Sequence, residues 1–231
     1  MKICHFSDLH LSPLGHIPQS RTENYHSDVK AEIEKLSRAL KLEAPDLILC
    51  SGDIFHLKNQ AAYSPKDLNY YRNLFINFPP FYCIPGNHDL PKSAFDNVGD
   101  SPYTSLRNLV PEVIKDLSWQ SVYIPTEGVY NTICLSGIPY VPMTGFKEKV
   151  TTFVESIQKR EEIKSPTLFL FMLHVDATPT KLLVNLWESY SYQELADIFP
   201  KNSILFLGHI HASFAPWQDP KRNITISKPW S

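Results

Sequence analysis

Residues 46–53 read DLILCSGD, a run of four apolar residues bounded by Asp46 on one side and by Ser51, Gly52 and Asp53 on the other. An apolar run of this length between turn residues predicts a buried strand. The strand ends directly in a glycine and a carboxylate. The residues on either side of this stretch determine which kind of sheet it joins.

The segment before this strand predicts a helix, because its apolar residues recur at helical spacing. They are Val29, Ile33, Leu36 and Leu40. Ser27 is suited to be the N-cap, and the helix should end before Pro45. A second helix is expected over residues 66–77, after Pro65. Strands are expected at residues 2–6 (KICHF) and at the start of FYCIPGNHD, residues 81–89. This β-α-β-α-β order predicts parallel strands with helical crossovers.

The rest of the chain continues the alternation of strands and helices. The middle, residues 90–143, is rich in proline and turn residues, with strand-like pieces at 121–124 and 129–135. A helix follows with Phe146, Val150, Phe153 and Ile157 on one face. Buried strands are expected at TLFLFMLH (167–174), SILFLGHIH (203–211) and NITIS (223–227), with a short helix at SYQELADIF (191–199).

Polar residues follow most of these apolar runs at the point where each strand ends. They are Asp8 and His10, Asp53, Asn87 and His88, His174, and His209 with His211. In open α/β sheets, ligands bind outside the carboxyl ends of the strands, so these clusters are expected to share one crevice. A histidine beside an apolar run is often structural. His209 and His211 are two residues apart, however, and such side chains in an extended segment point the same way, so they could converge on one point. Imidazole is also the commonest protein metal ligand.

Carboxylate and imidazole groups together suit divalent manganese, iron or zinc. An aspartate can bridge two metals, and a two-metal site can clamp the attacking and leaving oxygens of a phosphoryl displacement. The glycines before Asp53, Asn87 and His209 would let the backbone approach such a site. The strand-end pattern therefore predicts a metal centre.

The overall composition excludes some classes of protein. The 231 residues include 22 Lys and Arg against 24 Asp and Glu, a net charge of −2 with neutral histidines. This balance excludes binding to nucleic acid by overall charge alone. No apolar stretch is long enough to span a membrane, and the start MKICHFSDLH lacks the apolar region of a signal peptide. Four separated cysteines, Cys4, Cys50, Cys83 and Cys134, predict buried free thiols and a cytoplasmic location.

The order of the motifs D-x-H, G-D, G-N-H-D, His174 and G-H-x-H resembles that of calcineurin-like metallophosphoesterases. Within this superfamily, SGDIFHLK (51–58), GNHDLPKSAFDN (86–97) and SPYTSL (101–106) are similar to the nuclease subunit of SbcCD-type DNA repair complexes. The resemblance implies a sandwich of two mixed β-sheets flanked by helices, with the site at the carboxyl ends of the strands. Residues 1–231 are expected to form one nuclease-core domain. The family usually continues into a capping domain and a partner-binding tail, which are not seen in this sequence, so the chain is expected to be either a truncated catalytic core or a protein that works without those modules.

The resemblance implies a role for each candidate residue. One metal ion would be held by Asp8, His10, Asp53 and His211. A second ion would be held by Asp53, Asn87, His174 and His209. Asp53 would bridge the two ions, a bridging hydroxide would be the nucleophile, and His88 would assist the leaving oxygen as a general acid or a cation. Manganese is the expected metal, and iron or zinc are the alternatives.

The resemblance also implies a substrate and partners, with alternatives left open. The expected function is hydrolysis of DNA phosphodiester bonds by exonuclease and endonuclease action. An SMC-like ATPase would be the partner, and the family often forms homodimers. One alternative is a general or cyclic-nucleotide phosphodiesterase, because the same metal core serves many phosphoesters. The other is a binding scaffold that keeps the fold without catalysis.

Several other polar and aromatic residues allow two interpretations. His5 is expected to be structural, and His16 and His26 to be solvated in a loop. His56 is read as an ordinary loop histidine, with substrate contact as the alternative. Asp89 fits a support for the metal ligands and an exposed turn carboxylate equally well. Four aromatic residues, Tyr63, Tyr70, Tyr71 and Phe75, are expected in the core, with base stacking as the alternative.

Overall fold

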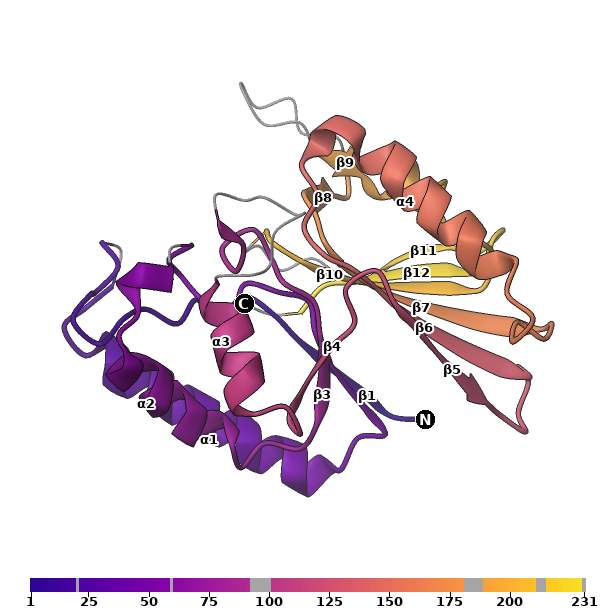
Figure 1. The fold of residues 1–231 in the computed structure, drawn as a ribbon. Coiled ribbons are helices and arrows are strands. Elements are labelled where there is room, and N and C mark those ends of the chain that lie inside the picture. The colour runs from indigo at the N-terminus through magenta and orange to yellow at the C-terminus, as the bar shows by residue number, and fades with distance from the viewer. Residues whose placement is uncertain (20, 59, 92–100, 181–188, 211–214, 230–231) are drawn as a thin grey trace.

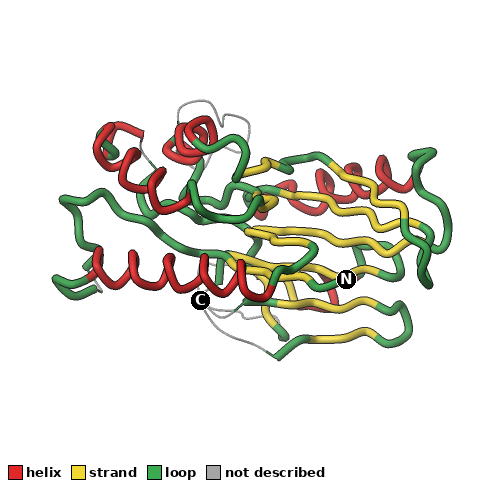
Figure 2. The backbone as a smooth tube through the Cα atoms, turned by 90° about the horizontal axis from the view of Figure 1, so that it is seen from below, coloured by secondary structure: helices red, strands yellow, loops and turns green. Residues whose placement is uncertain are grey.

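Two β-sheets lie face to face in the computed structural model of the protein, with helices on the outer side of each (Figure 1). The structure describes residues 1–19, 21–58, 60–91, 101–180, 189–210 and 215–229. The strands lie side by side with helices along their flanks (Figure 2). The predicted fold class, an α/β sandwich of two sheets with flanking helices, is confirmed, although only one of the two sheets is mixed and the other is parallel throughout its described strands.

The first sheet has the order β1-β2-β3-β4, and each neighbouring pair is parallel. Its strands are β1 (Ile3–Phe6), β2 (Leu47–Cys50), β3 (Phe81–Cys83) and β4 (Ile114–Asp116). Helix α1 (Tyr25–Glu43) connects β1 to β2, and α2 (Pro65–Phe75) connects β2 to β3 after the short 3-10 helix η1 (Gln60–Ala62). The predicted β-α-β-α-β unit is therefore confirmed, and all of its strands end at the same edge.

The second sheet has the order β11-β12-β10-β7-β6-β5. Its strands are β5 (Ser121–Pro125), β6 (Thr132–Ile138), β7 (Thr167–His174), β10 (Ser203–Gly208), β11 (Trp217–Asp219) and β12 (Ile224–Ser227). The four inner strands are parallel, while β5 and β11 run antiparallel at the two edges. Helix α4 (Met143–Gln158) precedes β7, and a small pair, β8 (Ala177–Thr178) and β9 (Tyr190–Ser191), leads into α5 (Tyr192–Ala196).

Alternate residues of the central strands pack into different layers of the core. In β2, Leu49 contacts the layer between the sheets, whereas Ile48 packs on the side of α1 and α2. In β7, Met172 faces the inner layer and Phe171 faces α4 and α5. Strand side chains alternate between faces, so a continuous apolar run suits a strand that is covered on both sides. This explains why these runs do not show the usual apolar–polar alternation.

The helix boundaries correct one prediction. Helix α1 begins at Tyr25, so Ser27 lies inside its first turn and is not the N-cap. The N-cap is Asn24, and the Ser27 hydroxyl donates to the Asn24 carbonyl at 2.7 Å. The helix ends as predicted, with Ala44 in the left-handed conformation just before Pro45. Helix α2 starts with a capping box between Ser64 and Asp67.

The proline-rich middle differs most from the prediction. Helix α3 (Pro102–Leu109) and strand β4 were not anticipated there. The strand expected at 129–135 starts at Thr132, and Val129 is 84% exposed in the preceding turn. Pairing of β6 with β5 and β7 sets these bounds, and a local pattern does not contain that information. None of the helices in the described part of the chain is long and apolar enough to cross a membrane.

Candidate metal centre

The carboxyl ends of strands from both sheets meet at one edge, and the predicted site residues follow them there. Cys50 of β2 pairs with Phe6 of β1, and Gly208 of β10 pairs with His174 of β7. The turns after these strands are strained. Asp8, His10, Asp53 and His209 have φ values of 59°, 48°, 53° and 94°. This left-handed backbone costs non-glycine residues roughly 1–3 kcal/mol each and clusters at functional sites.

Two glycines are needed because other atoms occupy the place of a side chain. A Cβ atom on Gly86 would lie 2.1 Å from Asp53 Oδ1. A Cβ atom on Gly208 would lie 2.2 Å from the Ser51 carbonyl oxygen. Both distances are far inside van der Waals contact, so the Asp53 carboxylate leaves no room for a side chain at Gly86 and the Ser51 carbonyl leaves none at Gly208.

The first ligand group contains Asp8, His10 and Asp53, each of which offers one ligand atom within 4.8 Å of the others. His10 Nε2 lies 3.7 Å from Asp53 Oδ2 and 4.0 Å from Asp8 Oδ1. The Asp8 carboxylate accepts hydrogen bonds from the Ser7 hydroxyl and, at 3.1 Å, from the His209 backbone N–H. Residues at opposite ends of the chain thus hold one carboxylate in place.

The second ligand group contains Asp53, His174 and His209, again within 4.8 Å. His174 Nε2 lies 3.2 Å from Asp53 Oδ2 and 3.1 Å from Asn87 Oδ1. Its Nδ1 donates to the Ser51 carbonyl at 2.7 Å. Because that nitrogen is engaged, Nε2 is the one that faces the predicted ligands. Asp53 belongs to both groups, as expected for the carboxylate that is predicted to bridge two ions.

The charges at the centre are strongly coupled. Burial would raise the pKa of the Asp53 carboxyl, but the adjacent His174 and His10 outweigh it and hold that pKa well below its usual range. Burial would lower the pKa of His174, but the Asp53 carboxylate raises it to about 9. Carboxylate, imidazole and amide oxygen donors fit a borderline divalent ion, so this residue set suits the metals that the sequence predicts.

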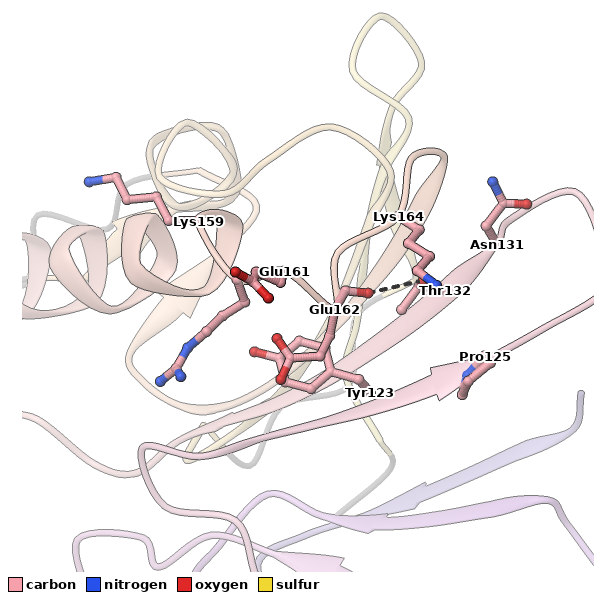
Figure 3. A pocket seen from close by; sticks show the side chains of 9 residues that line it. Tyr123, Pro125, Asn131, Thr132, Lys159, Glu161, Glu162 and Lys164 are labelled. Carbon is pink, nitrogen blue, oxygen red and sulfur yellow. Dashed lines mark hydrogen bonds between the residues drawn. The ribbon is translucent and has the colours of Figure 1, made fainter.

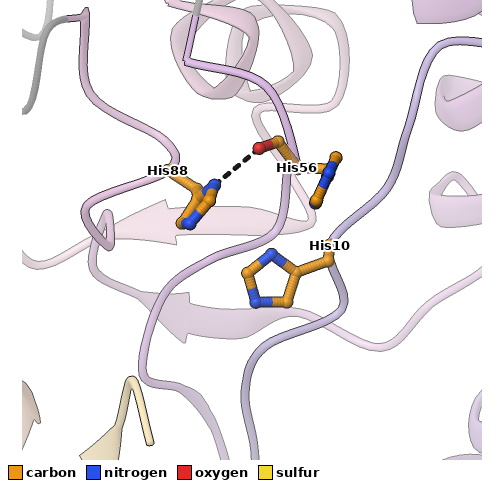
Figure 4. A group of neighbouring side chains, drawn as sticks. All are labelled: His10, His56 and His88. Carbon is orange, nitrogen blue, oxygen red and sulfur yellow. Dashed lines mark hydrogen bonds between the residues drawn. The ribbon is translucent and has the colours of Figure 1, made fainter. Parts of the chain in front are cut away.

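His10 of the first ligand group also belongs to a cluster of three histidines, together with His56 and His88 (Figure 4). The His88 ring centroid is 4.9 Å from that of His10 and 5.7 Å from that of His56. His88 Nδ1 donates to the His56 carbonyl at 2.5 Å, and the His88 backbone N–H donates to Asp53 Oδ1 at 2.8 Å. Burial, and then the neighbouring His88 and His16, lower the pKa of His56. The structure thus brings the predicted catalytic histidine next to Asp53, the predicted bridging carboxylate.

Asp89 is completely buried, so the interpretation as an exposed turn carboxylate is wrong. It accepts hydrogen bonds from the backbone N–H groups of Phe55 and Gly86 at 2.9 Å and of Ile54 at 3.2 Å. Burial, and then the charge of Asp53, raise the pKa of Asp89 to about 7. Asp89 therefore joins the turn after β2 to the turn after β3, which carry Asp53 and Asn87.

The remaining histidines and aromatic residues largely follow the predictions. His5 lies in β1, where its Nε2 contacts the Ser51 hydroxyl at 2.8 Å. His16 is exposed and hydrogen bonds to Ser12, but His26 is half-buried in α1 rather than solvated in a loop. Three of the four aromatic residues near the second helix are core residues, and Tyr70 is partly buried against them. The buried three are Tyr63, Tyr71 and Phe75.

His211 lies outside the described residues, so its predicted role stays a prediction.

Two residues at the site were not anticipated. Ser51 supplies the carbonyl that holds His174, and Asp176 Oδ1 lies 3.1 Å from His209 Nε2. The available signal for Asp176 was its spacing two residues after His174. Its partner His209 is brought close only by the pairing of β7 with β10.

A groove opens beside the histidine cluster. This cavity of about 870 Å³ is lined by His10, His56 and His88 at one end and by side chains of β1 and α1 along its length. Asp28, Glu32 and Arg21 are exposed there. Another cavity, of about 770 Å³, lies at the end of α4 by Lys159 and Lys164 (Figure 3). It contains none of the predicted site residues, so the groove is the cavity that concerns the metal centre.

Comparison with known proteins agrees with this geometry. The NAD nucleotidase NadN of Haemophilus influenzae superposes over 100% of this chain and 45% of its own, with a TM-score of 0.53 and 14% identity. A 5′-nucleotidase precursor of Thermus thermophilus superposes over 100% of this chain and 48% of its own, with a TM-score of 0.50 and 13% identity. These likenesses define a metallophosphoesterase-type fold.

Sequence similarity narrows the class further. The sequence profile of the calcineurin-like phosphoesterases matches residues 1–213. The chain belongs to the calcineurin-like phosphoesterase family, which implies a metal-dependent hydrolase. The DNA double-strand break repair protein Mre11 of Saccharolobus solfataricus is 26% identical over 231 residues, 98% of this chain and 54% of that protein. The chain thus spans about half the length of these relatives.

Proposed function

We propose that this chain is a two-metal phosphodiesterase that hydrolyses phosphodiester bonds of DNA. The observation that carries the proposal is the pair of ligand groups that share the Asp53 carboxylate. The similarity to Mre11 supports DNA as the substrate. Manganese is the proposed metal, as the family resemblance implies, and the mixture of carboxylate, imidazole and amide oxygen donors would also fit iron or zinc.

The proposed ligands divide as the sequence predicts. Asp8, His10 and Asp53 would hold one ion, with His211 assigned to it by resemblance alone. Asp53, Asn87, His174 and His209 would hold the other. When bound, two such ions neutralise charge on the phosphate and make a water molecule more acidic.

The chain's own residues would then orient the substrate and move a proton. Nδ1 of His88 is engaged with the His56 carbonyl, so its Nε2 is the atom available to a substrate. Held beside Asp53 by its backbone N–H, His88 is placed to donate a proton to the leaving oxygen or to face the phosphate as a cation. The groove along α1 would hold the leaving group of the substrate.

One feature of that groove favours the second candidate, a phosphodiesterase for small nucleotides. The groove carries the carboxylates of Asp28 and Glu32 together with the guanidinium of Arg21. Carboxylates repel a strand of phosphates, but they can accept hydrogen bonds from the amino groups of a single base. The two candidates thus differ in how many phosphates lie along α1.

Turnover of three substrates with manganese separates the candidates: linear single-stranded DNA, linear double-stranded DNA and a small chromogenic diester. DNA cleavage is expected, and His88→Ala should reduce it by roughly 10²–10⁴-fold. Manganese binding should be unchanged in that variant, and His26→Gln serves as the matched control. Intact DNA together with robust turnover of the small diester would overturn the nuclease proposal in favour of the second candidate.

The partner predictions follow from the nuclease-subunit resemblance. A homodimer is proposed, and light scattering of the purified chain tests it. Association with an SMC-like ATPase is the second proposal, and co-purification with such a protein tests it.

A further inference from the structure

Asp176 contacts the second ligand group from outside it. Its side chain is 22% exposed, and its Oδ1 lies 3.1 Å from Nε2 of His209. Its backbone carbonyl accepts the N–H of Tyr190 at 2.9 Å, which joins Asp176 to β9. Among the described residues, Asp176 belongs to none of the groups whose ligand atoms lie within 4.8 Å of one another.

The contact with Asp176 bears on which nitrogen of His209 can bind a metal. A neutral imidazole carries one N–H and one lone pair, and only the lone pair can bind an ion. If Nε2 donates its proton to Asp176, the lone pair is on Nδ1. His174 has the opposite arrangement, because its Nδ1 donates to the Ser51 carbonyl and its Nε2 faces Asp53.

Among the described residues, the ring contacts of His209 do not distinguish the two orientations of its imidazole. Its centroid lies 4.8 Å from that of His174 and 5.8 Å from that of Tyr140, and both are ring-to-ring contacts. Rotation of the imidazole by 180° would keep both contacts. It would also place a carbon against the Asp176 carboxylate and turn Nδ1 away. The carboxylate therefore selects one of two otherwise similar ring orientations.

We propose that Asp176 is a positioning residue that fixes the tautomer and orientation of His209, so that Nδ1 is the metal-binding nitrogen. This inference rests on the proposed two-metal function. Carboxylate partners of metal-binding histidines typically contribute 10–100-fold to metal affinity. The proposal assigns that contribution to one ion of the pair and leaves the other unaffected.

Two measurements on three variants test the proposal. Asp176→Ala removes the acceptor, and Asp176→Asn keeps one oxygen. Asp197→Asn is the matched control, since Asp197 is exposed and pairs with Arg222. Titration calorimetry with manganese should show one of two ions bound 10–100-fold more weakly in Asp176→Ala. The loss should be smaller in Asp176→Asn and absent in the control. Imidazole ¹⁵N NMR of the metal-free protein should show the Nε2–H tautomer of His209, and a mixture of tautomers in Asp176→Ala.

Each outcome bears on a different claim. If the wild-type chain binds no manganese, the two-metal function fails, and the NMR measurement still decides the role of Asp176 toward His209. Unchanged affinity and an unchanged tautomer in Asp176→Ala would overturn the inference. An equal loss in both Asp176 variants with an unchanged tautomer would also overturn it, because Asp176 would then bind the ion directly.

Discussion

Manganese binding should release a proton from His174, and this makes the affinity depend on pH. The Asp53 carboxylate raises the pKa of His174 to about 9, so the metal-free protein carries the proton on His174 at neutral pH. His174 Nε2, which faces Asp53 and Asn87, cannot bind an ion while protonated. The ion must therefore displace this proton.

The size of the effect follows from the pKa. At pH 7, removal of a proton from a group with a pKa of about 9 costs ~2.7 kcal/mol, at 1.36 kcal/mol per unit. Apparent affinity should therefore rise about tenfold per pH unit between pH 7 and 8.5. An ordinary histidine, with a pKa of ~6.5, is already neutral over most of this range, so the slope reports on His174.

Titration calorimetry in buffers with different ionisation enthalpies measures the effect directly. We expect close to one proton released per ion pair at pH 7.5. His16→Gln, which changes an exposed histidine, should leave this number unchanged. Binding heats independent of the buffer, together with an affinity that is flat from pH 7 to 8.5, would refute the inferred protonation of His174.

Three further predictions can be tested by unfolding of the protein. Chelated protein should lose stability as pH rises from 6.5 toward 9, measured by thermal unfolding, because the pKa of His174 is raised on folding from 6.5 to about 9. Gly86→Ala should lower the free energy of unfolding by ~1–3 kcal/mol and abolish manganese binding, because its Cβ would lie 2.1 Å from Asp53 Oδ1. Gly128→Ala, with nothing within 4 Å, is its control in urea unfolding. Phe171→Ala should cost ~3–5 kcal/mol in the same assay, since the ring is fully buried 4.7 Å from that of Phe199.

The sequence predicts those parts of the site that depend on strand ends. Asp8, Asp53 and His174 each follow a buried apolar run, and parallel strands necessarily end at one edge, so their convergence could be predicted. Apolar residues at helical spacing predict α1, the position after Pro65 predicts α2, and continuous apolar runs predict the buried strands. These features share a local signal that is repeated along the chain.

What could not be predicted depends on contacts between distant segments. The sequence could not decide between the two interpretations of Asp89, because only the fold brings the N–H groups of Ile54 and Phe55 to it. Asp176 and His209 are 33 positions apart (209 − 176) and meet through the register of β7 and β10. Helix α3 has apolar residues but only eight residues in all, too few for a clear period. Position relative to another strand carries this information, and a local pattern does not.

Ser51 shows how the two sheets are joined at the site. Its hydroxyl accepts from His5 Nε2 at 2.8 Å and donates to the Phe206 carbonyl at 3.0 Å, while its own carbonyl accepts from His174 at 2.7 Å. The hydroxyl therefore joins β1 and β10 to the end of β2, whereas the carbonyl orients His174, a proposed metal ligand. The two functions belong to different atoms, so a single substitution can separate them.

Ser51→Ala removes the hydroxyl and keeps the carbonyl. It leaves two buried groups without this partner, the His5 ring N–H and the Phe206 carbonyl, so the free energy of unfolding should fall by ~1–3 kcal/mol. Manganese affinity should stay within about twofold of wild type, because His174 keeps its acceptor. Urea unfolding and titration calorimetry on the same sample compare the two effects. A tenfold loss of affinity would mean that the hydroxyl bridge between the sheets, and not the carbonyl, holds His174 in place.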